Sequence, residues 1–266
     1  MTVFNDEFLE ALELSSDTAL CLHIKVDTGM GRLGYREAKD VLRAAAQIES
    51  HPSLVFEGIY THFATADQKD TSYFEVQLNK FREVLSQLNE HPRYVHAANS
   101  ASSLLHDQAD FNMIRFGVAM YGMPPSEEII DILPYKLKPA LSLYTKITQV
   151  KMLHPGDHVS YGATYEAVKP EWVATLPIGY ADGWIRHFSG YEVLVDGYPC
   201  EIIGRICMDQ IIIRLPKRYE VGTTVTLIGN SGVAEKTATE AAAYLDTINY
   251  EVTCQLSSRV PRKYLH

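Results

Sequence analysis

The sequence predicts an α/β chain in two parts, a parallel sheet with helical cover followed by a small, mostly antiparallel β domain. Up to about residue 135, apolar strand-like runs alternate with stretches of helical periodicity, which is the pattern of βα units. From about residue 139, short alternating runs are separated by turns rich in Gly, Pro and Asp, which is typical of antiparallel strands. Pro134 and Pro139 flank the change. We therefore expect two domains, residues 1–136 and 137–266.

The first part is expected to contain four strands, at residues 19–26, 54–61, 93–98 and 111–115. Apolar residues at helical spacing predict a helix over 36–50. A second helix is expected after Ser72, because Ser72 and Glu75 have the spacing of a capping box and an apolar stripe follows them. A short helix is expected from Ser100. Strands that alternate with helices predict a parallel sheet.

The second part is expected to be a small antiparallel domain. Its strands are predicted at residues 193–195, 201–206, 210–215 and 223–228, and one late helix at 236–245. Turn signals such as Asp182-Gly183 and Asp196-Gly197 separate these runs.

The composition fits a globular chain and excludes several classes of function. Apolar residues make up 46% of the 266 residues, enough for a core, so disordered classes are excluded. The net charge is −9 without a Lys/Arg cluster, which argues against a nucleic-acid partner. Apolar runs fall short of the ~20 residues that span a membrane. With no secretory signal visible, we predict a cytoplasmic protein. The four cysteines lack CxxC spacing, so we expect reduced thiols and no metal site.

Polar side chains stand at or just after the end of each expected strand in the first part, namely Lys25, His62, Asn99 and Arg115. The first three are each 37 residues apart, about one βα unit, so they should line one rim. In a (β/α)8 barrel this rim is the active-site face. Each residue alone is also compatible with an ordinary strand-end hydrogen bond.

Two loops at this rim have features that suit a phosphate. Asn99 and Ser100 open a helix, and Gly117 and Val118 follow the last expected strand. Backbone N–H groups, a hydroxyl and a glycine are the usual parts of a phosphate site in barrels, although a capped helix and a steric glycine are common alternatives. Four βα units are half of a closed barrel, which needs eight and about 250 residues. Either the other strands come from elsewhere or the chain is a fragment.

Eight stretches resemble alanine racemase, a family of pyridoxal-phosphate enzymes, in family order: 24–34 (IKVDTGMGRLG), 61–64 (THFA), 96–100 (HAANS), 115–122 (RFGVAMYG), 159–165 (VSYGATY), 178–183 (IGYADG), 204–210 (GRICMDQ) and 248–251 (INYE). The resemblance implies the C-terminal half of a (β/α)8 barrel followed by the β domain. It also implies that about the first hundred residues of the family are lacking, because the family's Schiff-base lysine lies in a Lys-Ala-x-Ala-Tyr-Gly-His-Gly-like segment that this sequence does not contain.

The resemblance assigns roles to residues of this chain. Tyr161 resembles the catalytic tyrosine that removes the α-proton of L-alanine, and Arg32 and His62 are expected to assist it. Arg115 resembles the arginine that donates to the pyridine nitrogen of the cofactor. The remaining cofactor contacts implied are Asn99, Ser100, Gly117, Val118 and Tyr250, and the substrate contacts are Arg32, Met208, Tyr180, Cys207 and Asp209. Lys25 resembles a lysine that is often carbamylated and whose carboxylate orients the arginine matching Arg32.

Two interpretations of function follow. The first is an alanine racemase that interconverts L- and D-alanine for peptidoglycan, acts as a homodimer with shared active sites, and is inactive as this chain alone. Racemisation needs acid–base groups on both faces of the α-carbon, and only the tyrosine is present here. The alternative is a non-catalytic remnant or an interaction module. A preference for alanine over serine is not determined by these motifs.

Overall fold

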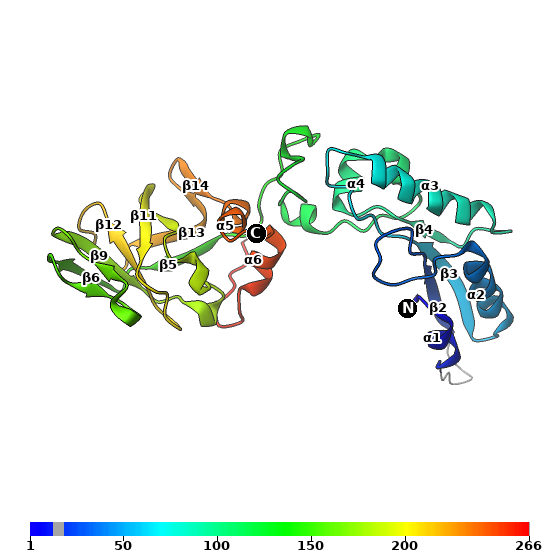
Figure 1. The fold of residues 1–266 in the computed structure, drawn as a ribbon, viewed down its shortest axis with the longest axis horizontal. Helices are drawn as coiled ribbons and strands as arrows, with labels where there is room; N and C mark the ends of the chain where they lie inside the picture. The colour runs from blue at the N-terminus through cyan, green and yellow to red at the C-terminus, as the bar shows by residue number, and fades with distance from the viewer. Residues whose placement is uncertain (13–18, 266) are drawn as a thin grey trace. The chain divides into compact units, whose positions relative to one another are not determined.

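The computed structural model describes residues 1–12 and 19–265, and it divides into two compact units, Met1–Leu137 and Lys138–His266 (Figure 1). The junction therefore falls inside the segment that Pro134 and Pro139 flank. Each unit has its own sheet.

The first unit is built on a four-stranded parallel sheet in the order β1-β2-β3-β4. Its elements are β1 (Thr2–Val3), α1 (Asp6–Glu10), β2 (Leu20–Lys25), α2 (Ala38–Ser50), β3 (Leu54–Tyr60), α3 (Ser72–Ser86), β4 (Tyr94–His96) and α4 (Ser100–Leu105). The predicted parallel sheet with helical cover is confirmed. The structure shows four parallel strands in this sheet and not a closed barrel.

The strand predicted at 111–115 is wrong. The segment runs beside β4, and the Asn112 and Arg115 amides donate to the Val95 and Ala98 oxygens. Among the described residues, however, its ladder is limited to one isolated bridge between His96 and Met113. The side chain of Asn112 explains the interruption, because its Oδ1 accepts from the Val95 amide at 2.8 Å. The fourth strand is instead β1, which is too short to carry a sequence signal.

The capping box predicted at Ser72 is also wrong. Helix α3 begins at Ser72, and Thr71 stands at the N-cap without a side-chain cap hydrogen bond. Asp70 Oδ1 accepts from the Ser72 amide at 2.9 Å, so an aspartate two residues earlier satisfies this amide. The short helix predicted from Ser100 is confirmed as α4, capped by Asn99.

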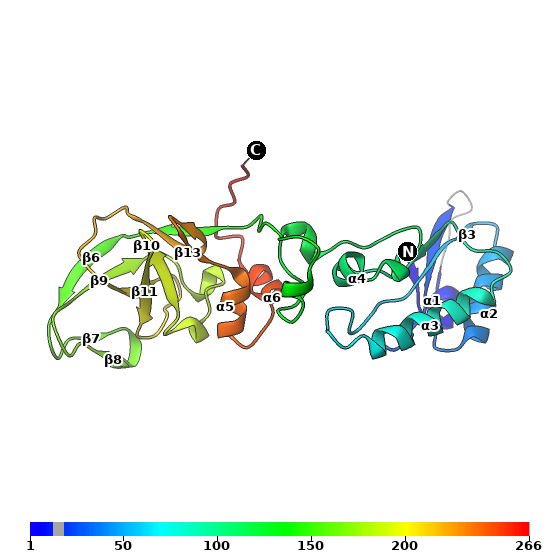
Figure 2. The same ribbon diagram turned by 90° about the horizontal axis from the view of Figure 1, so that it is seen from above.

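The two faces of this sheet differ in chemistry. Leu22 and Ile24 of β2 are fully buried in the core cluster that also contains Ile48 of α2 and Phe81 of α3. Burial of such side chains contributes about 1.5–3 kcal/mol each. Figures 1 and 2 show α2 beside β2 and β3, in agreement with their contacts. Strand side chains alternate between faces, so polar residues of β2 to β4 gather on the opposite face.

The second unit is a mostly antiparallel β domain, as predicted. Its large sheet has the order β14-β13-β10-β11-β12-β9-β6, with β5 paired to β13. The strands are β5 (Leu143–Lys146), β6 (Gln149–Leu153), β7 (His158–Val159), β8 (Tyr165–Glu166), β9 (Glu171–Leu176), β10 (Glu192–Val195), β11 (Tyr198–Ile203), β12 (Ile211–Leu215), β13 (Thr224–Ser231) and β14 (Ala234–Lys236). The predicted late helix is α5 (Ala238–Tyr244), and α6 (Asn249–Gln255) was not expected. In the described part of the chain, no helix is both long and apolar enough to span a membrane.

Candidate active site

Arg115 lies among hydrogen-bond acceptors at the carboxyl ends of β3 and β4. Its Nη2 donates to the backbone oxygens of Thr61 at 2.9 Å and Ala97 at 3.0 Å. The same nitrogen lies 3.2 Å from His62 Nδ1, and Nη1 lies 2.5 Å from His96 Nδ1. Arginine only donates. His96 Nδ1 therefore accepts, and its proton lies on Nε2. Nη2 carries only two protons, so His62 Nδ1 accepts by sharing one of them with a backbone oxygen, which again places the His62 proton on Nε2.

Burial and neighbouring cations control the charges of this cluster. Burial, and then Arg115, lowers the pKa of His62 to about 4 and that of His96 to about 3. Burial also lowers the pKa of Lys25 to about 8, against the attraction of Asp27 and with the help of Arg115 and Arg32. Near neutral pH the histidines are thus uncharged while the arginines keep their charge. Such an electropositive rim suits an anionic ligand.

The four strand-end residues expected at one rim occupy the carboxyl edge of the sheet. Lys25, 2% exposed, ends β2, and its Nζ donates to the Val26 oxygen at 2.7 Å. His62 follows β3 and contacts Arg115. Asn99 follows β4, and its Nδ2 donates to the Phe63 oxygen at 3.5 Å. The parallel sheet brings these residues, far apart in the sequence, to one edge.

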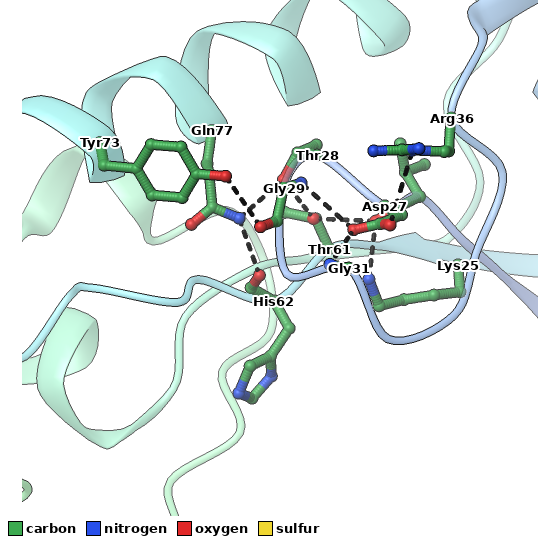
Figure 3. Close-up of polar contacts among 11 residues, drawn as sticks. Lys25, Asp27, Thr28, Gly29, Gly31, Arg36, Thr61, His62, Tyr73 and Gln77 are labelled. Atoms are coloured by element: carbon green, nitrogen blue, oxygen red, sulfur yellow. Dashed lines mark hydrogen bonds and ion pairs between the residues drawn. The ribbon is translucent and has the colours of Figure 1, made fainter.

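Asp27 organises the loop between β2 and α2 that carries Arg32. Its Oδ1 accepts from the amides of Gly29 at 3.2 Å and Gly31 at 2.9 Å, and its Oδ2 lies 3.9 Å from Arg36 Nε (Figure 3). The loop then turns back against β2 at Gly34, where φ is +121° and a Cβ would lie 2.8 Å from the Lys25 oxygen. Only glycine fits this position.

Gln77 of α3 links this loop to the end of β3. Its side chain is fully buried, and its Nε2 donates to Thr28 Oγ1 and to the His62 oxygen, both at 3.2 Å (Figure 3). Its Oε1 accepts from the Ala64 amide at 2.8 Å. Thr61 Oγ1 donates to the Val26 oxygen at 2.9 Å and lies 2.7 Å from Thr28 Oγ1, which closes the network. The loop of Arg32 and the residue His62 are therefore held by one helix side chain.

A set of hydrogen-bond donors lies where the sequence predicted a phosphate site. Ser100 Oγ accepts from the amides of Gly117 at 2.8 Å and Ala119 at 3.3 Å, which leaves its hydroxyl proton free to donate. Asn99 Oδ1 caps α4 by accepting from the Ser102 amide. Within residues 1–12 and 19–265, the amides of Ser100 and Val118 have no hydrogen-bond partner. Ser100 and Val118 therefore offer three donors.

Tyr161, in the second unit, stands on a strained turn. It is 71% exposed, and the residues around it have left-handed backbones, with φ +65° at Ser160 and +46° at Ala163. Ser160 Oγ donates to the Arg205 oxygen, which ties the turn to the loop after β11. Left-handed non-glycine residues cost free energy and are typical of functional sites. The turn presents the Tyr161 phenol outward.

The remaining predicted residues of the second unit group around two crossing loops. The Tyr180 amide donates to the Cys207 oxygen at 3.1 Å, and the Ala181 amide donates to the Met208 oxygen at 2.9 Å. A Cβ on Gly179 would lie 2.3 Å from the Cys207 oxygen, so glycine is required for this approach. Cys207 Sγ lies 3.5 Å from Ser160 Oγ, beside Tyr161.

Met208 and its neighbours are partly open to solvent. Met208 is 57% exposed, and its amide has no hydrogen-bond partner among the residues that the structure describes. Asp209 is exposed, and Tyr250, 37% exposed, lies on α6. No group of three metal-ligating side chains is in position to hold an ion within the described ranges.

Sequence reasoning gave no role to His23, Glu57, Tyr60, Gln77 or His96, although all contact or support the cluster. A signal was available for one of them, His23. His23 and Lys25 are polar residues at i and i+2 between the apolar residues of β2, which places both on the face away from the core. Gln77 carried no such signal, because polar residues are ordinary on a helix surface.

Comparison with known proteins identifies the family. A family model described as alanine racemase, N-terminal domain, matches residues 1–125, and one described as alanine racemase, C-terminal domain, matches residues 140–264. The chain is 59% identical over 266 residues to an alanine racemase of Listeria monocytogenes serotype 1/2a, covering 100% of this chain and 72% of that protein. The chain belongs to the alanine racemase family. The predicted resemblance is confirmed.

Solved structures agree with the family assignment. A crystal structure of alanine racemase from E. faecalis is 49% identical, has a TM-score of 0.95, and covers 99% of this chain and 72% of that chain. A histidine racemase from Leuconostoc mesenteroides is 30% identical with a TM-score of 0.92, covering 100% of this chain and 73% of that chain. The alanine racemase fold thus supports more than one racemase substrate.

Alanine racemases are isomerases that depend on pyridoxal phosphate. The expectation that this chain lacks about a hundred residues of the family is not confirmed, since the N-terminal domain model matches from residue 1. The chain spans 72% of the length of the Listeria racemase.

Proposed function

We propose that this chain provides the alanine racemase site for interconversion of L- and D-alanine. We further propose that it works in the cytoplasm and that the D-alanine formed there is used for peptidoglycan. The observation that carries the proposal is Arg115, a permanent donor held, partly buried, among uncharged acceptors. In the described residues its hydrogen-bond partners are two backbone oxygens and two histidines, and none is a carboxylate. Identity of 59% to an alanine racemase, against 30% to a histidine racemase, favours alanine as substrate.

The residues of the first unit fit pyridoxal phosphate. Its phosphate would be held by the hydroxyl of Ser100 and by the loop of Gly117 and Val118, with Asn99 fixing the start of α4. Arg115 would donate to the ring nitrogen, since its Nε–H and one Nη1–H are left over from the contacts above. When bound, the cofactor supplies a ring that withdraws electrons from the substrate α-carbon. Arg115 keeps that ring nitrogen unprotonated, because it does not give up its own proton.

The chain's own residues then divide the remaining work. Tyr161 would take the α-proton from L-alanine on one face, and Arg32 would bind the substrate carboxylate. His62, whose Nδ1 faces Arg115, has an Nε2–H to offer to a phenol that a second copy of the chain supplies. The Met208 amide would donate to the substrate, with Tyr180, Cys207 and Asp209 at the entrance. We further propose a homodimer with shared sites, which the outward position of Tyr161 supports.

We also propose that residues 1–266 alone do not racemise alanine. Two acid–base groups must flank the α-carbon, because one group only returns the proton it removed. The segment that carries the family's Schiff-base lysine is not found in this sequence. With Tyr161 alone, one face of the substrate α-carbon therefore has no acid–base group.

A mixed dimer tests both the proposed racemase role and the proposed inactivity of residues 1–266 alone. The Listeria racemase is prepared with phenylalanine in place of its counterpart of Tyr161, so that it keeps its lysine and loses its phenol. We expect little turnover from this variant alone and none from residues 1–266 alone. Mixing the two should restore alanine racemisation, because this chain donates Tyr161 to a site that holds the lysine.

The matched control is Y161F in this chain, which should restore nothing although it still associates. Racemisation by residues 1–266 alone would contradict the proposed inactivity. Association without restored turnover would contradict the racemase role and favour the alternative of an interaction module.

Lys25 carbamylation is a further part of the proposal. A carbamate forms when the neutral amine attacks the carbon of CO2 and loses a proton, and the low pKa of Lys25, about 8, makes the neutral amine available. At that pKa about a tenth of Lys25 is neutral at pH 7 and about nine tenths at pH 9. The carboxylate formed would lie near Arg32, whose charge already acts on Lys25.

Carbon-13 NMR in labelled bicarbonate measures this modification. We expect one carbamate signal that grows from pH 7 to pH 9 and that is absent in K25R, which keeps the charge but not the nucleophile. A spectrum at pH 9 that is the same for both proteins would refute the assignment.

A further inference from the structure

A line of four side chains crosses the polar face of the sheet in the first unit. Arg115 Nη1 lies 2.5 Å from His96 Nδ1, His96 Nε2 lies 2.8 Å from His23 Nδ1, and His23 Nε2 lies 3.3 Å from Glu57 Oε2. His23 belongs to β2, Glu57 to β3 and His96 to β4, so the line spans three neighbouring strands. The roles given above to Arg115 and His62 involve neither His23 nor Glu57.

The donor at one end fixes the direction of every hydrogen bond in this line. Arginine has no acceptor, so His96 Nδ1 accepts and its proton lies on Nε2. That proton is then donated to His23 Nδ1, which places the His23 proton on Nε2, facing the Glu57 carboxylate. A proton on the Nδ1 of either ring would set two donors against each other.

The residues around His96 and His23 restrict both rings to these positions. His96 is 3% exposed and stacks on Tyr60 at 4.7 Å between ring centroids, and the Arg115 guanidinium lies over the same Tyr60 ring at 5.2 Å. Gly58 pairs with His23 across the sheet, and a Cβ there would lie 2.4 Å from His23 Nδ1. A side chain at position 58 would therefore displace the His23 ring from the line.

The Glu57 carboxylate at the far end of the line supplies a negative charge that balances the positive charge of Arg115 without contacting Arg115 itself. The side chains of His23 and Glu57 are 18% and 25% exposed, so the carboxylate at the far end of the line is partly open to solvent. A negative charge at the end of a hydrogen-bond chain polarises each bond toward itself. Arg115 is thus oriented through two neutral rings, and its Nε–H and one Nη1–H stay available.

We propose that Glu57, His23 and His96 form a hydrogen-bond relay that orients Arg115, with His23 and Glu57 as positioning residues. What Arg115 then donates to rests on the proposed function. The relay itself does not, because it is a property of this chain without any ligand.

Nitrogen-15 NMR of the full chain, labelled at its ten histidines, tests the relay. His→Gln variants assign the signals. We expect His23 and His96 to be Nε2–H tautomers at pH 7. In R115M, His96 should become a mixture of both tautomers, because its Nδ1 loses its donor. A proton on Nδ1 of either ring in the unchanged chain would overturn the proposal.

Proton exchange at the Arg115 guanidinium tests positioning. Loss of a hydrogen bond worth about 1 kcal/mol predicts roughly fivefold faster exchange in E57L. E57Q keeps an acceptor for His23 but not the negative charge, so it should accelerate exchange less than E57L does. E49L, the same change as E57L at an exposed site on α2, should have no effect. If E57L is poorly folded, G58A gives the same test by displacing His23.

Unchanged Arg115 exchange in both E57L and G58A would refute the positioning role. Equal acceleration in E57Q and E57L would refute it as well, since an acceptor would then not matter. These readouts need neither cofactor nor turnover. Failure of the relay is therefore distinguishable from failure of the mixed-dimer experiment.

Discussion

Replacement of Gln77 by leucine is expected to lower the stability of the first unit by about 2–4 kcal/mol, because each buried polar group left unpaired costs about 1–3 kcal/mol. The Gln77 side chain is fully buried and serves three partners, Thr28 Oγ1, the His62 oxygen and the Ala64 amide. Leucine is similar in size but pairs with none of them. The loop of Arg32 and the segment of His62 should loosen together.

Amide hydrogen exchange read by mass spectrometry measures this effect where it occurs. Peptides covering residues 26–34 and 61–66 should exchange faster in Q77L. Both tryptophans, Trp172 and Trp184, lie in the second unit, so their fluorescence should report unchanged unfolding there. Q87L is the matched control, since Gln87 is the exposed C-cap of the same helix and such surface changes stay within about 0.5 kcal/mol. Equal exchange in Q77L and Q87L would show that the network does not hold the loops.

The first unit is expected to lose stability steeply as the pH falls from about 6.5 toward 4. In the unfolded chain histidine takes up a proton near its ordinary pKa of 6.5, whereas burial and Arg115 hold the folded pKa of His62 at about 4 and that of His96 at about 3. Between these values the unfolded state binds more protons, so acid favours unfolding. Each proton contributes about 1.4 kcal/mol per pH unit, and less at the partly exposed His62, where solvent screens the charge.

Urea unfolding of the first unit, followed by hydrogen exchange at pH 7, 6, 5 and 4, gives this slope. The double variant H62Q/H96Q should be less stable at pH 7 but should show a slope smaller by up to two protons. H51Q, in the exposed turn after α2, touches no residue of the cluster and is the control. The same slope in H62Q/H96Q and the unchanged chain would mean that these two histidines do not drive acid unfolding.

Local patterns predicted most of the fold because the strands and helices carry their own periodicity. The apolar run of β2 and the helical spacing of α2 were recognised within two residues of their observed bounds. The predictions failed where a side chain, in place of a backbone oxygen or the expected cap, accepted the hydrogen bond of a backbone amide. Asn112 Oδ1 accepts from the Val95 amide of β4 and interrupts the strand predicted at 111–115, and Asp70 takes the place of a capping box at Ser72. A two-residue strand such as β1 has no periodicity to detect.

The candidate site was predictable to the extent that strand ends and motifs mark it. Lys25, His62, Asn99 and Arg115 were found by their place at the ends of expected strands, and Tyr161, Tyr180 and Met208 only by resemblance to a family. Gln77 and Glu57 were missed because a glutamine on a helix and a glutamate in a strand are ordinary surface residues. Their partners lie in other elements, and only the packed sheet and α3 bring them into contact.

The amino-acid order alone decided which chemical groups this protein possesses, where strands and helices form, and which family it resembles. Packing decided how those groups behave. The direction of the bonds from Arg115 to Glu57, the neutrality of His62 and His96 near pH 7, and the lowered pKa of Lys25 all arise from contacts between distant segments. The physical reason is that desolvation and hydrogen bonding depend on separation in space, which three strands in register set and which the linear sequence leaves open.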